Sequence, residues 1–255
     1  MIEPVRKAPD PISLELLQAI NDWQRGGSPS QKQRRGEHLK AAAAGLDPKF
    51  RTCGLCLFRQ ITLTKGSLWD LLAENRLSET ISAWTTDPAV AKEFKGGVPP
   101  QGQGYQGVIF MLPPGAGSVI VNLGVLFADG DFQEAVERYR QDIDGFSAGI
   151  GRYGASQSEA VIELDRLDVA QVYAYGGFSS SRIEIATAML GHPPSAPELA
   201  LFNERARRAG AKFGPYWIGE ESVRRVMRHM LPHIERLRAI KRFQDAAKKA
   251  KAASP

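Results

Sequence analysis

The stretch Cys53-Gly54-Leu55-Cys56-Leu57-Phe58 marks a change in the pattern of the chain, because the residues before it have helical spacing. Such a short apolar run is typical of a buried strand. Beyond it, short strand patterns and helical patterns follow one another without regular strand–helix–strand alternation. This order predicts an α+β fold, and it argues against a doubly wound parallel sheet.

Two helices are expected before this strand. Apolar residues recur at helical spacing from Leu14 to Trp23 and stop at Gly26-Gly27, and a second helical pattern runs over about residues 31–44. Together they form a predicted N-terminal helical arm over residues 1–48. The pattern fits either a docking arm or a lid packed on the core.

The predicted core spans residues 49–195, and a basic helical extension spans residues 196–255. Within the core, helices are expected over residues 65–77, from Asp87-Pro88 onward, and over residues 131–143. Strands are expected over residues 80–86, 107–112, 118–123, 159–164 and 169–175. The strands over residues 107–112 and 118–123 are predicted to be neighbours in a sheet.

Composition is that of an ordinary soluble globular protein. The 255 residues are 43% hydrophobic and 24% charged, which is enough to bury a core. No apolar stretch approaches the roughly 20 residues of a membrane span, and the first residues lack the apolar core of a secretory signal. Cys53 and Cys56 provide no disulfide framework. We therefore expect action in a cytoplasm, no membrane partner, and delivery, where it occurs, by a route other than Sec export.

Net charge differs between the two parts of the chain. Residues 196–255 hold 14 Lys and Arg against 6 Asp and Glu, whereas residues 1–195 hold 19 against 22. A basic stretch of this kind attracts phosphate backbones or acidic protein surfaces. It also fits a solvated helix face, and the sequence leaves these interpretations open.

Two short motifs carry side chains that suit a ligand bearing phosphates. Arg59 ends the apolar run, and its planar fork suits two phosphate oxygens; a salt bridge to a core carboxylate is the alternative. Trp84, Thr85 and Thr86 lead into the helix at Asp87-Pro88. Hydroxyls and free backbone N–H groups at such a junction face a ligand or simply cap the helix.

A third motif, Gln157-Ser158-Glu159, enters a predicted strand after the glycine-rich loop of residues 145–156. Period-two alternation places Gln157 and Glu159 on one face of that strand. A carboxylate bonded to a ribose 2-hydroxyl stabilises the positive charge that develops when a ribosyl–nicotinamide bond breaks. Glu159 is the candidate for that group, and the polar face of an exposed edge strand is the alternative interpretation.

In this order the three motifs resemble the Arg / Ser-Thr-Ser / Gln-or-Glu-x-Glu signature of mono-ADP-ribosyltransferases of the bacterial-toxin type. The resemblance covers about residues 50–178 and implies two small packed, mainly antiparallel sheets with NAD bound as the substrate in a cleft between them. It implies that Arg59 holds the NAD phosphates and that Glu159 drives transfer.

The resemblance also implies that the hydroxyl segment supports the nicotinamide ribose. Thr85 and Thr86 are the matching hydroxyls, with Trp84 beside them. Either Thr85 or Ser82 takes the role of the first serine, because the strand register cannot be read from the sequence.

The third motif bears on the acceptor. In the family, the form that begins with Glu goes with arginine acceptors, and the form that begins with Gln goes with Asn, Gln, Thr or nucleobase acceptors. Gln157 therefore predicts a non-arginine protein side chain, or RNA or DNA, as the acceptor. Tyr153 resembles the aromatic residue that helps such enzymes hold their substrate, although a loop tyrosine also serves in packing. The toxin resemblance further implies an antitoxin, immunity protein or chaperone as a partner.

Two alternative functions remain, namely an NAD glycohydrolase and a binding module of the same fold that no longer turns over NAD. No metal is expected. Cys53 and Cys56 with His229 and His233 imitate a Cys₂His₂ zinc site, but Pro232 disturbs the helix that would align the histidines.

Overall fold

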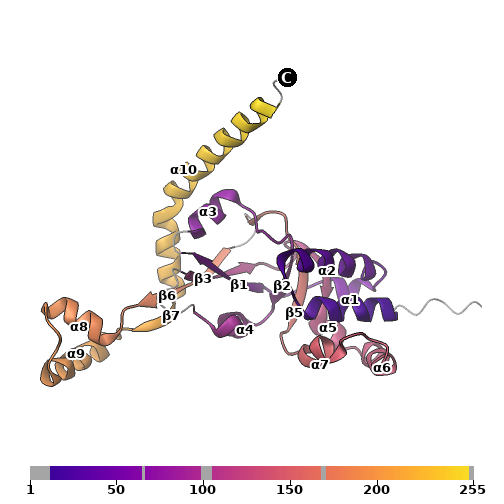
Figure 1. Cartoon of the computed structure of the whole chain (residues 1–255), viewed down its shortest axis with the longest axis horizontal. Coiled ribbons are helices and arrows are strands. Elements are labelled where there is room, and N and C mark those ends of the chain that lie inside the picture. Colours follow the sequence, from indigo (N-terminus) through magenta and orange to yellow (C-terminus); the bar gives the residue numbers. More distant parts are fainter. Residues whose placement is uncertain (1–11, 65–66, 99–104, 168–170, 253–255) are drawn as a thin grey trace, which may run out of the picture. The chain divides into compact units, whose positions relative to one another are not determined.

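The computed structural model describes residues 12–64, 67–98, 105–167 and 171–252 (Figure 1). The chain is mixed α and β with antiparallel strand pairs, as predicted. It divides into two compact units. The first unit comprises Met1–Arg59, Arg76–Val90 and Leu112–Ala170, and the second comprises Gln60–Asn75, Ala91–Met111 and Gln171–Pro255.

Both predicted N-terminal helices are present in the first unit. Helix α1 (Leu14–Gln24) begins at Ser13, whose hydroxyl accepts a hydrogen bond from the backbone N–H of Leu16. Helix α2 (Pro29–Ala42) begins with a capping box between Ser28 and Gln31. These local contacts satisfy backbone groups that the first turn of a helix leaves unpaired.

The strands of the first unit are neighbours in the order β4 (Ser118–Asn122), β5 (Glu159–Glu163), β2 (Ile81–Thr85) and the beginning of β1 (Leu57–Thr64). Strand β1 starts four residues later than the sequence predicts. Leu55 is 62% exposed, and none of residues 53–56 is buried, so this part of the apolar run does not enter the core. In consequence Arg59 lies within the strand and not at its end.

Short helices complete the first unit. They are η1 (Pro48–Arg51), α5 (Leu123–Phe127), α6 (Gly130–Arg138), η3 (Phe146–Ala148), α7 (Ile150–Tyr153) and the start of α4 (Pro88–Glu93). Helix α6 confirms the helix predicted from residue 131, although it ends earlier than expected. The glycine-rich loop before Gln157 contains η3 and α7.

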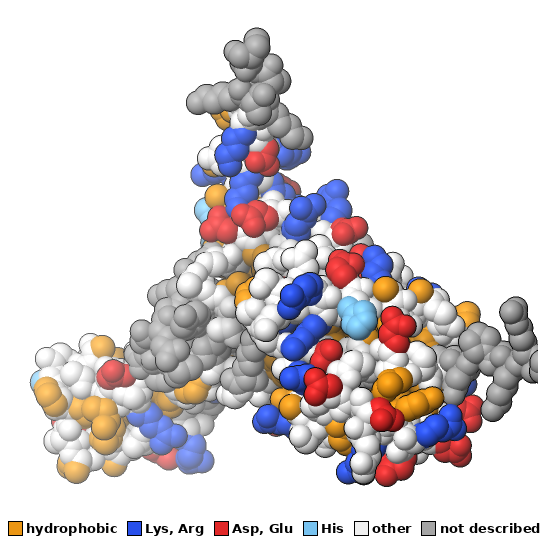
Figure 2. All heavy atoms as spheres, turned by 45° about the vertical axis from the view of Figure 1, so that its right-hand side comes forward, with side chains coloured by type: hydrophobic (Ala, Val, Ile, Leu, Met, Phe, Trp, Pro, Cys, Tyr) orange, Lys and Arg blue, Asp and Glu red, His pale blue; other side chains and the backbone are white. Residues whose placement is uncertain are grey.

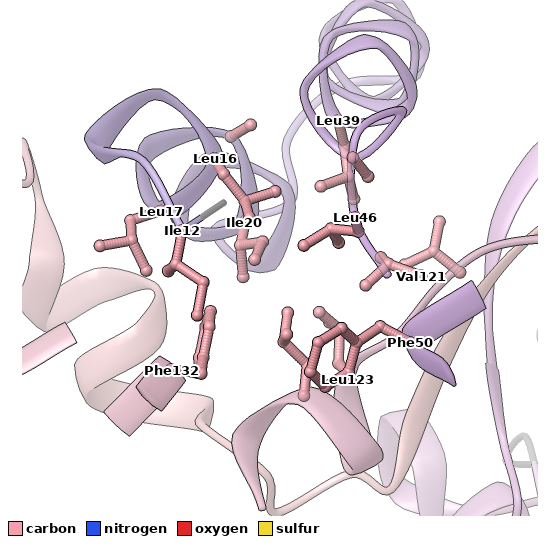
Figure 3. Close-up of a cluster of buried hydrophobic side chains, with 14 of the residues drawn as sticks. Ile12, Leu16, Leu17, Ile20, Leu39, Leu46, Phe50, Val121, Leu123 and Phe132 are labelled. Atoms are coloured by element: carbon pink, nitrogen blue, oxygen red, sulfur yellow. The ribbon is translucent and has the colours of Figure 1, made fainter. Parts of the chain in front are cut away.

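The core of the first unit is built around α1 (Figure 3). Leu16, Leu17 and Ile20 of this helix are at most 1% exposed, and they face Leu123 and Phe132 from the α5 and α6 region. Burying one such side chain contributes roughly 1.5–3 kcal/mol. Helix α1 is therefore an integral part of this core.

The second unit contains the rest of β1, followed in hydrogen-bonding order by β3 (Tyr105–Leu112), β6 (Gln171–Ser179) and β7 (Gly214–Ile218). The predicted pairing of residues 107–112 with 118–123 is wrong, because β3 pairs with β6 and β4 pairs with β5. The seven strands form one order of neighbours, β4-β5-β2-β1-β3-β6-β7, where the resemblance implied two sheets. Strand β1 is long enough to take part in both units.

Helices of the second unit are α3 (Ser67–Glu74), α8 (Arg182–Leu190), α9 (Ala196–Arg208) and α10 (Glu220–Ala252). Strand β7 interrupts the stretch that was predicted to be entirely helical, because its residues pair with β6. Helix α10 contacts α3, and the Arg238 guanidinium donates hydrogen bonds of 3.2 and 3.0 Å to the carbonyl oxygen of Leu72.

Candidate active site

The pairing of three neighbouring strands in the first unit brings the predicted motifs together. Thr85, the last residue of β2, lies directly opposite Glu159, the first residue of β5. On its other side Thr85 lies opposite Phe58 of β1, which is followed by Arg59. Residues from three distant parts of the sequence thus meet where these strands begin or end.

Glu159 is a buried carboxylate with a defined hydrogen-bond donor. Glu159 is 6% exposed. The indole Nε1–H of Trp23 donates a hydrogen bond to Glu159 Oε1 at an N–O distance of 2.6 Å. Burial raises the pKa of Glu159 from 4.5 to about 6, although the Trp23 hydrogen bond and the charge of Arg59 both lower it. At neutral pH the carboxylate is therefore largely ionised.

Arg59 has a carboxylate partner in the same unit. Its Nη2 donates to Glu79 Oε2 at 2.6 Å, and its Nη1 donates to the carbonyl oxygen of Ala83 at 2.9 Å. The salt bridge that the sequence left open as an alternative is therefore formed. The Nε atom is buried without a hydrogen-bond partner, so one donor of the guanidinium fork is unpaired.

The Arg59 charge is stabilised by the carboxylates around it. Burial lowers the pKa of Arg59, whereas the charges of Glu79 and Glu159 raise it. Glu79 also lies 3.5 Å from the ammonium of Lys32. Burial raises the pKa of Glu79, but the charges and hydrogen bonds of Arg59 and Lys32 together outweigh burial and lower this pKa below its usual value. The result is a cation at the site whose charge is shared by two carboxylates.

Thr85 and Thr86 hold the residues that directly precede β5. Thr85 Oγ1 donates to the carbonyl oxygen of Gln157 at 2.7 Å and accepts from the N–H of Asp87 at 3.1 Å. The N–H of Thr86 donates to the carbonyl oxygen of Ser158 at 3.1 Å. Ser158 has a φ of 44°, an uncommon conformation for a residue other than glycine. These bonds hold the strained turn that leads into Glu159.

Two predicted residues of the second motif lie in the interior. Trp84 and Ser82 are each 1% exposed, and the Trp84 indole donates to Ser82 Oγ at 3.0 Å. This hydrogen bond gives the buried indole N–H and the buried hydroxyl a partner within the core. The register thus brings Thr85, and not Ser82, next to Glu159.

Gln157 and Tyr153 lie on the approach to β5. Both are half-buried, and the guanidinium carbon of Arg152 lies 5.1 Å from the centre of the Tyr153 ring. Gln24 of α1 donates from Nε2 to the carbonyl oxygen of Gly154 at 3.0 Å. The loop that carries Tyr153 is therefore attached to α1.

Sequence reasoning missed the contribution of α1. Trp23 was assigned only to the apolar stripe of a helix, yet its indole reaches the predicted catalytic carboxylate. Asn21 is fully buried, and its side-chain amide binds Asp144, directly before the glycine-rich loop, and Ile150 within it. A buried-looking asparagine inside an apolar helical stripe is the signal that could have revealed this role, since buried amides need partners.

Across the described part of the chain, no group of three or more His, Cys, Asp or Glu side chains is arranged to hold a metal ion. Over the same residues, no helix combines the length and the apolar character that crossing a membrane demands. In comparisons with family models, curated proteins and solved structures, the chain has no significant match.

Proposed function

We propose that the protein is a mono-ADP-ribosyltransferase that cleaves NAD and transfers ADP-ribose to a macromolecular acceptor. The observation that carries the proposal is the register of β1, β2 and β5, which joins Arg59, Thr85 and Glu159 in one unit. These are the residues that the sequence motifs assign to NAD. The resemblance to toxin-type transferases supplies the reaction, and the geometry supplies a setting in which it is feasible.

The donor groups of Arg59 suit the negatively charged part of NAD. Its buried Nε–H has no partner, and an arginine fork binds phosphate oxygens strongly. Glu79 already takes one Nη2 hydrogen, so the phosphates would share the guanidinium with this carboxylate or replace it. The proposal therefore includes competition between substrate and Glu79 for Arg59.

Glu159 would act on the nicotinamide ribose. As the bond from C1′ to the nicotinamide nitrogen breaks, its electron pair stays with nicotinamide, which leaves uncharged. Positive charge builds on the ribose, and a nearby carboxylate stabilises it. A lone pair of the acceptor then forms the new bond to C1′, and the acceptor loses its proton to solvent. An ionised Glu159 is needed, which its pKa of about 6 allows at neutral pH.

The acceptor is proposed by class only. Gln157 at the start of the third motif favours a non-arginine protein side chain, or a base of RNA or DNA. Tyr153 and Gln157 are half-buried residues near Glu159 in the sequence and would contact the acceptor. An antitoxin, immunity protein or chaperone remains a proposed partner on the same analogy.

Label transfer from adenylate-labelled NAD into a cell lysate tests the proposal. The wild type is expected to transfer label, and Glu159→Gln is expected to lose at least about a hundredfold, because the neutral amide cannot stabilise positive charge. Digestion of the product by protease or by nuclease then names the acceptor class. Glu137→Gln, a change at an exposed glutamate, is the matched control.

Each outcome separates the alternatives. If nicotinamide is released but no macromolecule is labelled, the protein would be an NAD glycohydrolase and not a transferase. If the protein neither transfers label nor releases nicotinamide, the result would favour a binding module that does not turn over NAD. Full activity of Glu159→Gln would show that the catalytic role is assigned to the wrong residue.

A further inference from the structure

Three side chains near the end of helix α1, Asn21, Trp23 and Gln24, form hydrogen bonds to the candidate site and to the loop beside it. Asn21 binds Asp144, directly before the glycine-rich loop, and Ile150 within it. Gln24 binds the loop at Gly154, and Trp23 binds Glu159 itself. The sequence separations of these contacts run from 123 to 136 residues. A helix that only covered the core would need none of them.

The Trp23 ring packs closely against α2. Gly36 of α2 packs against it, since a Cβ built at Gly36 would lie 3.2 Å from the Trp23 ring and 2.9 Å from the Cγ2 of Ile81. A glycine in a helix interior is unfavourable by about 1 kcal/mol relative to alanine. Its presence here leaves space for the indole between α2 and β2.

The direction of the Trp23 hydrogen bond is important for Glu159. An indole N–H only donates, so it binds the ionised carboxylate well and fixes one of its two oxygens. The other oxygen, Oε2, is then held in a defined direction. This is the arrangement that a carboxylate needs in order to meet a substrate hydroxyl without first reorganising.

We infer that Trp23 is a positioning residue for Glu159, and that α1 is a structural part of the active site and not a separate arm. Trp23 does not touch the reacting atoms; it orients the carboxylate that does. The catalytic part of this inference rests on the proposed function. The orientation of Glu159 by Trp23 can be tested without it.

The first test is a pH titration of the ¹⁵N-labelled wild-type protein, followed through the indole N–H signals in NMR spectra. One indole signal, assigned by its absence in Trp23→Phe, is expected to shift with a midpoint near 6, the pKa of Glu159. In Glu159→Gln the shift is expected to vanish. A Trp23 signal that does not respond to pH between 4.5 and 7.5 would overturn the inference, whether or not the protein transfers ADP-ribose.

The second test compares pH profiles of label transfer. Trp23→Phe removes the donor and keeps an aromatic ring, so the pKa of Glu159 should rise. A hydrogen bond to a charged group changes a protonation equilibrium by about tenfold, which is about one pKa unit. We therefore expect transfer to fall about fivefold at pH 6, where about half of the wild-type carboxylate is ionised, and to fall less at pH 8. Trp217→Phe, which loses an indole bond to the Lys92 carbonyl oxygen in the second unit, is the control.

The two tests fail in different ways. An equal loss at both pH values would show that the Trp23 indole does not bind the ionised Glu159, because the loss of such a hydrogen bond must change the pKa of the carboxyl, and it would refute the inference. If the wild type transfers nothing but the Trp23 signal titrates, the proposed function is refuted while the orientation of Glu159 by Trp23 stands.

Discussion

At the scale of single residues, the chain places one carboxylate, Glu159, where water is excluded. The Trp23 indole and the positive charge of Arg59 compensate in part for the burial of its charge. Burial outweighs both, so the pKa lies at about 6. A raised pKa at a site with a specific charge partner is typical of functional carboxylates, although structural networks also produce it.

This raised pKa predicts a stability effect that depends on pH. Between pH 4.5 and about 6 folded Glu159 keeps a proton that the unfolded chain has lost, so folding stability decreases as pH rises through this window. Glu159→Gln removes the ionisation. Its free energy of unfolding relative to wild type should therefore increase by up to about 2 kcal/mol from pH 4.5 to pH 8.

Urea unfolding of both proteins at the two pH values measures this difference. Glu137→Gln, at a side chain that is 73% exposed, should show no such change. A difference between Glu159→Gln and wild type that is the same at both pH values would mean that Glu159 ionises as readily in the folded protein as in the unfolded chain.

At the scale of elements, α1 and the glycine-rich loop depend on each other. Gly149 lies so close to Asn21 that an added Cβ would be 2.3 Å from Oδ1 and 2.4 Å from the backbone oxygen. No side chain fits at such distances. The glycine is therefore required by this close approach.

Gly149→Ala is expected to displace the loop and to cost about 1–3 kcal/mol of stability, as overpacking of a buried contact does. It should also reduce label transfer, because the loop leads into Glu159. Gly130→Ala is the control, since an added Cβ at this first residue of α6 meets nothing within 4 Å. Thermal unfolding that is the same for both variants would contradict the close packing of α1 on the loop.

At the scale of the whole molecule, the basic excess lies on helices of the second unit. Arg207 and Arg208 of α9 both bind Glu204, and Arg224 and Arg225 of α10 bind Glu220 and Glu221 one turn earlier. Exposed pairs of this kind contribute little energy, so these cations remain able to meet phosphates. On the face of the first unit that Figure 2 shows, basic and acidic side chains are interspersed.

Salt dependence distinguishes a nucleic-acid surface from a solvated one. Arg205 and Arg228 are exposed and lie outside the helix pairs just described. If they contact phosphates, Arg205→Gln with Arg228→Gln should reduce the slope of log affinity for single-stranded RNA against log salt by about 0.7 per contact. Arg140→Gln in the first unit is the control. An unchanged slope would identify the basic surface as solvated, or as a surface for an acidic protein.

Much of the local structure could be predicted. Caps and spacing predicted α1, α2 and the start of α4, because a helix is stabilised by residues close to one another in the sequence. The start of β1 was predicted four residues too early, because an apolar run does not show which of its residues hydrogen-bond to a neighbouring strand. The pairing of β3 was also missed, for the same reason.

Local residue patterns were sufficient to predict α1, α2, the start of α4 and the three motifs, because caps, periodicity and residue types act over a few positions. The position of Thr85 opposite Glu159 and the hydrogen bond from Trp23 to this carboxylate, across 136 positions, follow from the tertiary structure alone. Strand register and contacts between distant segments depend on the packing of the whole unit, and no local pattern encodes them.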